Sequence, residues 1–459
     1  MLKKGIYVIF KANVISLVFN LLTSFLLPKY LSVEAYAAIK TFQLYVTYVG
    51  LLHLGYADGM YLKYGGSDIE KLDGCSLKTD IHTMVLFQVW VSIISALASL
   101  ILKDPIWVAF SISIFPLNIA SYYKLLFQAT GEFDKYGKIT NITTFVTFFA
   151  NVVLLFVLDC RTNGMLYIAF YVLVDFVVLI ILERAIQEEF HLKKYHASFD
   201  LKILVSNVKD GILLMLGNLS TAIFTGMDRW FVKFLLDTVS FAQYSFAVSI
   251  ENFLNVAVTP ISVTLYNYFC THKSKEEQLR LLRYSMIFGS ILPICLFPAK
   301  FILEHYLTHY LDAANIIVFL FAAQSYAIVN KCIYINLYKA QRKQMRYFSK
   351  LIVAISAGFA FNVLFYILLK EKVAFAIGTM FSNILWFVLS VLDFPELKIS
   401  AKEYIYLTLE SLMLIAFGNF MNSILGFIAF SIGTGIASWI FMNESVRQIV
   451  KMLKIKLHT

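Results

Sequence analysis

The hydrophobicity of this chain is almost unbroken: from Gly5 to Phe441, long apolar runs follow one another with only short charged connectors between them. Hydrophobic residues make up 59% of the chain and charged residues only 15%, with a mean hydropathy of +0.73. A water-soluble domain is about half apolar and about a quarter charged. The sequence therefore predicts a polytopic membrane protein with almost no soluble part.

Fourteen of the apolar runs are long enough to cross a bilayer. About 20 residues in a helix span roughly 30 Å of hydrocarbon, and the helix is the only open-chain form that satisfies its own backbone in lipid. We therefore expect an all-α fold with transmembrane cores at residues 5–27, 36–57, 81–102, 105–127, 139–158, 164–182, 208–228, 240–268, 284–303, 315–338, 347–369, 373–392, 403–421 and 424–441. The first run is too long for a signal peptide and no small-residue cleavage site follows it, so we expect an uncleaved helix.

The basic residues predict the orientation. With the N-terminus inside, about 28 of the 39 Lys and Arg residues lie in cytoplasmic segments and about 8 in outer segments, while Lys11, Lys40 and Lys331 lie within spans. Basic residues near span ends are retained in the cytoplasm, so we expect both termini there, in a bacterial cytoplasmic membrane. The net charge of +10 is then explained by topology and by attraction to anionic membrane lipids, and no nucleic-acid partner is expected.

The chain lacks the motifs of a soluble catalytic domain. Its connectors are short, and its five cysteines have no paired spacing, which indicates neither a disulfide framework nor a metal site. No P-loop, HExxH, Gly-x-Ser-x-Gly or Cys-x-x-Cys motif is present. We therefore expect no enzyme activity, no cofactor and no metal, and we do not expect an ATP-driven pump.

A weak internal repeat indicates two similar halves. A shift of 205 residues aligns Asn13 with Asn218 without a gap, and also Leu31 with Leu236. A repeat of six spans gives both halves the same orientation, as in transporters built from parallel repeats. We expect two parallel six-helix lobes around a central cavity: an N-terminal lobe at 1–183, a cytoplasmic connector at 184–207, a C-terminal lobe at 208–393, and two additional helices with a basic cytoplasmic tail at 394–459.

Three short stretches carry a family resemblance. Residues 28–32 read PKYLS, residues 52–66 read LHLGYADGMYLKYGG, and residues 226–231 read GMDRWF. They resemble the polysaccharide biosynthesis proteins that flip lipid-linked O-antigen and capsule repeat units, which belong to the multidrug/oligosaccharidyl-lipid/polysaccharide exporter superfamily. The resemblance implies an alternating-access transporter without enzymatic activity. Ala37 departs from the pattern, because the family often has glycine after the tyrosine at that point.

The motif residues have a structural interpretation beside the functional one. Glycines near the inner end of the second span allow the chain to leave the helix at positive φ, and Asp58 is placed to bond the freed backbone amides. We interpret Asp58 and Gly59 as structural or gate-forming; contact of Asp58 with substrate is the alternative. The other motif or gate candidates are Asp228, Arg229, Asn13 and Asn218.

Three lysines within spans are candidates for substrate binding. A charge at mid-helix costs about 2.5 to 3.5 kcal/mol on insertion scales, so it normally faces a cavity or a partner. We expect Lys11, Lys40 and Lys331 to line the cavity and to neutralise the pyrophosphate of a polyprenyl-linked glycan. The alternative is that each long side chain snorkels to the nearer headgroups.

Embedded carboxylates are the candidates for ion coupling. Glu251 lies in the eighth span, and Asn255 is four residues later on the same helical face. Asp175 lies mid-depth in the sixth span without a local partner. For both residues the alternative is an ion pair, for example with Lys11 or Lys331. Glu410 belongs to a peripheral span, and we expect it to snorkel.

These patterns favour a flippase for a polyprenyl-pyrophosphate-linked oligosaccharide, moving it from the cytoplasmic to the outer leaflet. One alternative is a cation-coupled multidrug antiporter of the same superfamily, which a lysine in place of a carboxylate in the first span disfavours. A membrane-embedded glycan polymerase is the other, and the short outer loops disfavour it. The expected partners are the lipid-linked oligosaccharide, membrane lipids, and the polymerase and chain-length machinery of the same polysaccharide.

Overall fold

The computed structural model describes residues 2–65, 67, 72–130, 132–196, 198–271 and 274–457; the side chains of residues 2–15, 102, 133–134, 136–137, 139–140, 267, 271 and 452–457 lie outside that description. Within these ranges all regular structure is helical and there is no strand. The chain divides into two compact units, Met1–Ile223 and Phe224–Thr459. Each unit is described by itself below.

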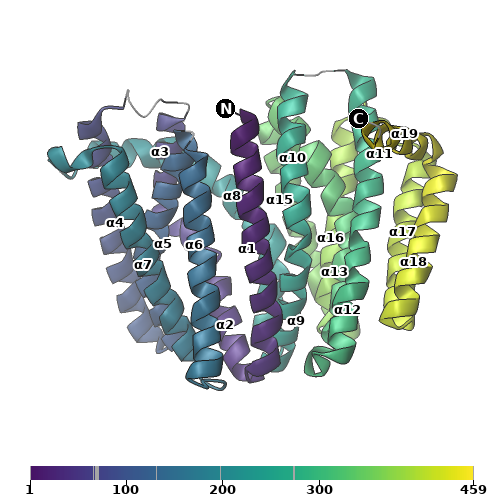
Figure 1. Ribbon diagram of the computed structural model, residues 1–459, viewed down its shortest axis with the longest axis horizontal. Helices are drawn as coiled ribbons and strands as arrows, with labels where there is room; N and C mark the ends of the chain where they lie inside the picture. Colours follow the sequence, from purple (N-terminus) through teal and green to yellow (C-terminus); the bar gives the residue numbers. More distant parts are fainter. Residues whose placement is uncertain are drawn as a thin grey trace. The chain divides into compact units, whose positions relative to one another are not determined.

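The first unit is a bundle of long helices joined by short connectors (Figure 1). Its elements are α1 (Leu2–Tyr30), α2 (Val33–Val46), the 3₁₀ turn η1 (Val49–His53), α3 (Tyr56–Tyr64), α4 (Gly74–Leu102), α5 (Pro105–Ala129), α6 (Phe133–Val152), the π-helical η3 (Val153–Val157), α7 (Gly164–Glu189), η4 (Leu192–Lys194) and the first two thirds of α8 (Leu201–Leu235). The helix α8 continues past Ile223, so it begins in the first unit and ends in the second.

The second unit is also built from helices and ends in a C-terminal hairpin. Its elements are α9 (Thr238–Asn252), α10 (Leu254–Thr271), α11 (Lys275–Ile291), η5 (Leu292–Cys295), α12 (Leu296–His305), η6 (Thr308–Tyr310), α13 (Ala313–Val329), the π-helical η7 (Asn330–Tyr334), α14 (Ile335–Ala340), α15 (Gln344–Leu369), α16 (Val373–Asp393), α17 (Ala401–Phe420), α18 (Ser423–Phe441) and α19 (Asn443–Leu457).

The all-α polytopic fold is confirmed. Helical segments occupy each of the fourteen expected positions within the described ranges. Ten helices among the described residues are long and apolar enough to cross a membrane by length and composition. The lobe boundaries at 183, 207 and 393 follow the repeat in the sequence rather than packing, and they stay a prediction; by packing, residues 184–223 belong to the first unit.

Polar caps fix where many helices begin. The Asp73 carboxylate accepts from two backbone amides at the start of α4, and Asp104 precedes Pro105, which opens α5. Asp, Ser and Asn favour this position because they satisfy amides that have no partner inside the helix, and proline suits the first helical position. At α9 the hydrogen bond from the backbone amide of Ser240 lowers the pKa of Asp237. The caps thereby set the length of apolar helix between the connectors.

The C-terminal hairpin of α17 and α18 is anchored to the second unit at both ends. At one end Arg283 of α11 donates from Nε to Oε1 of Glu403 over 2.6 Å. At the other end the buried Nζ of Lys300 donates to the carbonyls of Gly418 and Met421, both at 2.6 Å. A cation suits this position because the last carbonyls of a helix carry partial negative charge. The hairpin therefore packs as part of the unit.

Glu410 corrects one expectation from the sequence. Its side chain is only 1% exposed, and its Oε2 accepts from Thr434 Oγ1 of α18 over 2.7 Å. It lies in the middle of α17 on the face that packs against α18. The carboxyl group is therefore held between two helices and does not snorkel.

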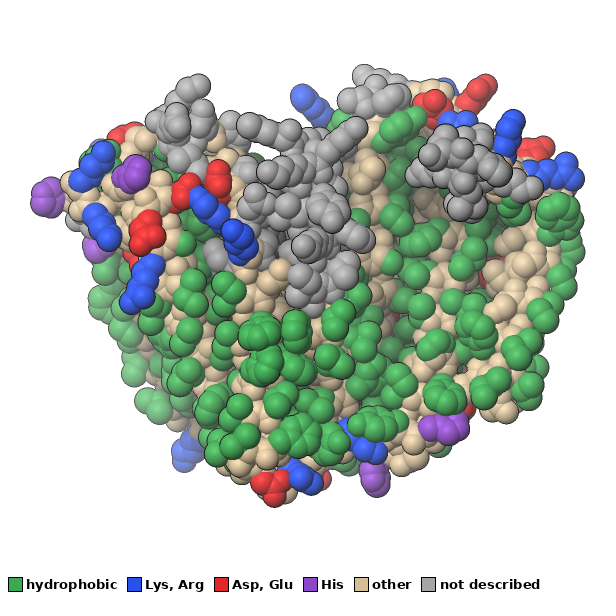
Figure 2. Space-filling model, viewed as in Figure 1, with side chains coloured by type: hydrophobic (Ala, Val, Ile, Leu, Met, Phe, Trp, Pro, Cys, Tyr) green, Lys and Arg blue, Asp and Glu red, His purple; other side chains and the backbone are tan. Residues whose placement is uncertain are grey.

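The surface has the pattern of a membrane protein. Figure 2 shows hydrophobic side chains over the middle of the helices in each unit, with charged side chains gathered near the helix ends. Many large apolar side chains are exposed, including Trp90 and Leu213 at 65% and 75%. Exposed apolar area on this scale indicates a lipid-facing surface.

Candidate functional site

A membrane-length helix in the second unit is interrupted beside two of the candidate residues. The helices α9 and α10 are separated at Phe253, whose backbone amide bonds Ile250 and so makes a tighter turn than an α-helix does. Glu251 lies in the last turn of α9, where its Oε1 accepts from Nε2 of Gln324 on α13 over 2.5 Å. A glutamate at membrane depth is thus held by a neutral amide.

Lys331 lies in a second irregular segment. The π-helical η7 follows α13, and such segments are frequent at functional sites. The Nζ of Lys331 donates to Asn255 Oδ1 over 2.8 Å and to Thr259 Oγ1 over 3.2 Å. Its carbonyl accepts from Ser262 Oγ and from Asn336 Nδ2. The ammonium group is therefore directed toward α10.

These side chains form two hydrogen-bonded groups that follow one another along α9–α10 and α13–η7, and together we call them the polar strip. It consists of Glu251, Asn255, Thr259, Ser262, Gln324, Lys331 and Asn336. Glu251, Asn255 and Thr259 are four residues apart on α9–α10, and Gln324 and Lys331 are seven residues apart on α13–η7. Each spacing returns to the same face of its helix, so the two rows of side chains meet. The sequence predicted the shared face of Glu251 and Asn255 and named Lys331. The sequence analysis did not identify Gln324, Ser262 and Asn336, although each is a polar residue within an apolar run.

The charges of the polar strip are not paired with each other. Within the described ranges, no carboxylate lies within 4.0 Å of Lys331 Nζ and no basic group lies within 4.0 Å of the Glu251 carboxylate. Asp228 and Arg229 interact electrostatically with Glu251 at longer range. Both charges are instead bonded to amides and a hydroxyl, which a ligand or water can replace.

The GMDRWF stretch places a buried carboxylate near the polar strip. Asp228 accepts from Tyr244 Oη over 2.7 Å, from Thr379 Oγ1 over 3.3 Å and from the backbone amide of Arg229 over 2.7 Å. These bonds join α8, α9 and α16. Asp228 therefore has hydrogen-bond partners on three helices. Its role is to hold these helices in position.

In the first unit, the second motif brings two helices into backbone contact. Gly55 has φ +84°, and a Cβ on Gly59 would stand 1.9 Å from the carbonyl oxygen of Asn207 on α8. A Cβ on Gly211 would stand 2.1 Å from the Gly55 carbonyl oxygen. Small residues at this spacing let membrane helices approach closely. Gly59 is thus at a helix crossing.

Asp58 and Asn218, two of the predicted motif residues, lie together at this crossing. Asn218 Nδ2 donates to Asp58 Oδ1 over 3.4 Å, and His53 Nε2 is 3.9 Å from Asp58 Oδ2. His53 Nδ1 also accepts from the backbone amide of Gly55. The side chains of Asn13 and Lys11 lie outside the described residues.

Asp80 is a buried centre that the sequence analysis missed. It has no exposed surface, and its Oδ2 accepts from Lys63 Nζ over 2.8 Å and from Tyr64 Oη. Asn207 Nδ2 donates to Oδ1 over 3.4 Å, and Tyr56 Oη donates to the backbone carbonyl of Asp80. Asp80 therefore links α3, α4 and α8. Its signal in the sequence was weak because it stands at the polar edge of a span.

The remaining candidates have other partners. Asp175 of α7 interacts electrostatically with Lys124 of α5. Lys40 is half-buried on α2, where its Nζ donates to Gln43 Oε1 over 3.0 Å and lies 5.3 Å from the Tyr36 ring centroid. In the described part of the chain, no group of three His, Cys, Asp or Glu residues could hold a metal ion.

This arrangement is the fold of a multi-pass membrane transporter. The chain is similar to the lipid II flippase MurJ in an inward closed conformation, with a TM-score of 0.64 and 13% identity, covering 95% of this chain and 99% of that one. It is also similar to an inward-facing multidrug resistance MATE family transporter of the MOP superfamily, with a TM-score of 0.58 and 12% identity, covering 85% and 99%. At this identity the likeness shows the fold.

A family model matches part of the sequence. Residues 75–271 match the profile of the polysaccharide biosynthesis protein family. The match supports the resemblance over α4 to α10 and includes the GMDRWF stretch, while the stretches at 28–32 and 52–66 lie outside it. No curated protein matches the chain at a significant level.

Proposed function

We propose that this chain is a flippase that moves a polyprenyl-pyrophosphate-linked oligosaccharide, such as an O-antigen, capsule or exopolysaccharide repeat unit, from the cytoplasmic to the outer leaflet. The family match supports polysaccharide biosynthesis, and the transporter fold supports movement across the membrane. An oligosaccharide on a pyrophosphate cannot cross hydrocarbon unaided, because burying an unpaired charge costs many kcal/mol. A flippase must therefore offer the pyrophosphate a compensating charge at membrane depth.

The observation that carries this proposal is the bonding of Lys331. Among the described residues the Lys331 ammonium bonds an amide and a hydroxyl and no carboxylate, so its charge stays available for an anion, whereas a cation in an ion pair does not. In our proposal the phosphate takes the place of Asn255 and Thr259 as acceptor for Lys331. The bonds of Lys331 to Asn255 and Thr259 join a charge to neutral groups, whereas a bond to phosphate joins two opposite charges, so the exchange favours bound substrate. Lys11 and Lys40 stay proposed as further substrate-binding cations.

Glu251 is the proposed coupling group. Its protonated form keeps a hydrogen bond with Gln324, and its ionised form accepts one, so the polar strip accommodates both states. Proton uptake and release there would bias the equilibrium between two conformations of the unit. Asp175 is the second candidate for coupling, with Lys124 as its counter-charge.

A cation-coupled multidrug antiporter is the second candidate function. The observation that favours it is the nearness of two carboxylates, Asp228 and Glu251, in one unit. Efflux of a cationic dye from cells would distinguish it, because a flippase for an anionic lipid gives none. We propose no enzymatic role, so a glycan polymerase stays the least favoured alternative.

The proposed setting is a bacterial cytoplasmic membrane with both termini inside, where a polysaccharide polymerase and chain-length machinery would consume the flipped product. The distribution of basic residues supports this orientation. Single cysteines in a cysteine-free background should be labelled from outside at Lys103 and Lys370, and protected at Lys194 and Lys343. Reversed labelling would contradict the direction of flipping.

Replacement of Lys331 tests the function. In cells that depend on this chain for surface polysaccharide, Lys331→Ala should lower the polysaccharide at least about tenfold at normal protein level, because about 1.4 kcal/mol of lost stabilisation is a factor of ten. Lys331→Arg should restore part of it, since the charge survives. Lys402→Ala, an exposed lysine in the first turn of α17, is the control and should have no effect. Normal export by Lys331→Ala would refute the role of the cation.

A further inference from the structure

A pocket in the second unit begins at Leu337, directly after the last residue of the polar strip, and shares no lining residue with the strip. It has a volume of about 530 Å³ and is formed where α10, α11, α14 and the connector between α16 and α17 meet. Eight residues line it: Phe269, Lys275, Gln278, Leu337, Ala340, Gln341, Arg342 and Glu396. This volume falls in the range of small-molecule sites, which is about 300 to 1,000 Å³.

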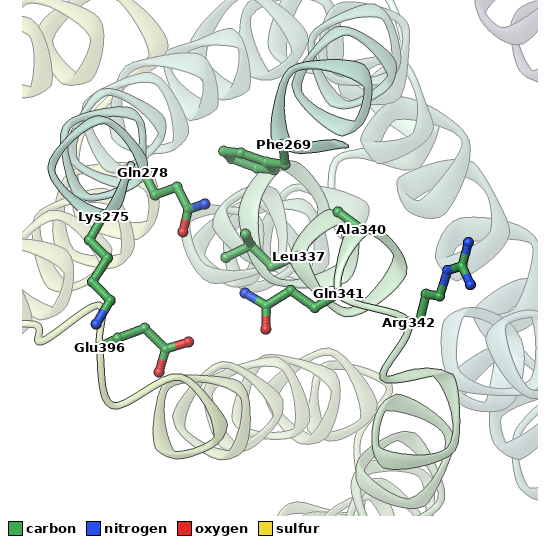
Figure 3. Close-up of a pocket in the computed structure, with 8 residues that line it drawn as sticks. All are labelled: Phe269, Lys275, Gln278, Leu337, Ala340, Gln341, Arg342 and Glu396. Carbon is green, nitrogen blue, oxygen red and sulfur yellow. The ribbon is translucent and has the colours of Figure 1, made fainter. Parts of the chain in front are cut away.

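The pocket has an apolar floor and a polar rim. Phe269 and Leu337 are buried beneath it. Figure 3 shows the amides of Gln278 and Gln341 directed toward the middle of the pocket, with Lys275 beside Glu396 at one edge and Arg342 at the opposite edge. The cationic groups at the edges are exposed, while Gln278 is buried. A ligand held here would place an apolar part against the floor and a polar part between the amides.

The rim is rich in donors. Lys, Arg and Gln side chains bring many N–H groups, whereas Glu396 and the two amide oxygens are the acceptors contributed by the eight lining side chains. Two cations face one carboxylate, so the rim has a net positive charge. Such a donor set matches an anion with several acceptor oxygens, of which phosphate is the common biological case.

The position of the pocket indicates which phosphate-bearing molecules can reach it. Its lining residues come from the connector ends of α10, α11 and α14, and the basic residues of these connectors predict the cytoplasmic side. Lipid phosphates of the inner leaflet lie at that depth. We propose that this pocket binds the phosphate-bearing headgroup of a lipid with a net negative charge on the cytoplasmic side of the membrane.

Two lipids supply this chemistry. One is the polyprenyl diphosphate of the transported lipid, met before it reaches the polar strip; this source rests on the proposed function. The other is an anionic phospholipid bound as a fixed component of the unit, which is independent of that function. Both need Lys275 and Arg342 as counter-charges.

Labelling of a cysteine in the pocket tests the proposal. In a cysteine-free chain in nanodiscs, Ala340→Cys should react with a maleimide at least about threefold more slowly when phosphatidylglycerol replaces phosphatidylcholine, or when undecaprenyl diphosphate is added. Inorganic pyrophosphate in solution is the third probe, and it should protect less than a lipid because it lacks the apolar part. Protection by undecaprenyl diphosphate alone identifies the substrate; protection by phosphatidylglycerol identifies a structural phospholipid.

Charge variants complete the test. Lys275→Gln and Arg342→Gln together should abolish the protection, whereas Lys398→Gln, an exposed lysine near Glu396 outside the pocket, should leave it. Equal labelling under all lipid conditions, or protection that survives loss of both cations, would overturn the proposal. Lack of protection in a protein that still flips its substrate would overturn the pocket proposal and leave the proposed function intact. Protection by phosphatidylglycerol in a protein that does not flip would support the pocket proposal and contradict the proposed function.

Discussion

The two units bond a lysine near a polar cluster in opposite ways. In the first, the exposed Lys63 meets the buried carboxylate of Asp80 over 2.8 Å, and Tyr64 and Asn207 also donate to that carboxylate. In the second, Lys331 is bonded to Asn255 and Thr259, both neutral. An ion pair with satisfied hydrogen bonds is a stable structural contact, because breaking the pair leaves an unpaired buried group. A charge held by neutral groups can change partners at low cost, which a transport cycle requires.

The largest expected effect on stability is at Asp80. Asp80→Ala removes the acceptor of two side-chain bonds from buried donors and of one from Lys63, so we expect a loss of about 3 kcal/mol in the free energy of unfolding. Thermal unfolding in detergent measures it. Asp73→Ala is the control on the same helix: it removes an exposed N-cap and should cost about 1 kcal/mol. If Asp80→Ala is as stable as Asp73→Ala, Asp80 is no structural centre.

A smaller effect is expected where α3 crosses α8. Gly211→Ala puts a Cβ against the backbone of Gly55 and Gly59, so the two helices must move apart, at about 1 to 3 kcal/mol. Gly217→Ala on the same helix has no atom within 4 Å of its Cβ and should be neutral or slightly stabilising. Equal melting temperatures for the two variants would contradict close packing at this crossing.

The smallest effect on stability is expected in the polar strip. Glu251→Gln keeps the size of the side chain and a hydrogen bond with Gln324, so the melting temperature should stay within about 2 °C of wild type. Its flipping rate in proteoliposomes should no longer respond to an imposed pH gradient. Glu304→Gln, a carboxylate at the end of α12 that accepts from Ser423, is the control and should keep the response. An unchanged response in Glu251→Gln would make Glu251 a structural contact, with directionality supplied by polymerisation outside.

The sequence predicted the helices well because the constraint behind them is simple. Lipid forces every span to satisfy its backbone internally and to be long and apolar, and composition records both properties. Single charged residues were predicted less well. Glu410 stands as a single carboxylate within an apolar run, and Thr434 of α18 provides the partner that makes its burial possible. Asp80 has its partners on α3 and α8, far away in the sequence.

The sequence predicted the polar strip in part. Helical spacing alone placed Glu251 and Asn255 on one face, and the rarity of intramembrane charge singled out Lys331. Their partners are 73 and 76 residues away along the chain. The contact therefore depends on how α10 packs against η7, which no local pattern contains. The π-helical turn that orients Lys331 likewise has no sequence signal in the run NKCIY.

The most direct test of this account is the flipping rate per folded molecule of Lys331→Gln, measured in proteoliposomes beside Asp80→Ala. We predict that Lys331→Gln keeps the wild-type melting temperature within about 2 °C and loses at least about tenfold in flipping, because only the exchangeable charge is gone. Asp80→Ala should lose stability, while its folded fraction flips at a rate near wild type. Flipping at the wild-type rate by Lys331→Gln, or a loss that its reduced stability explains in full, would contradict the account.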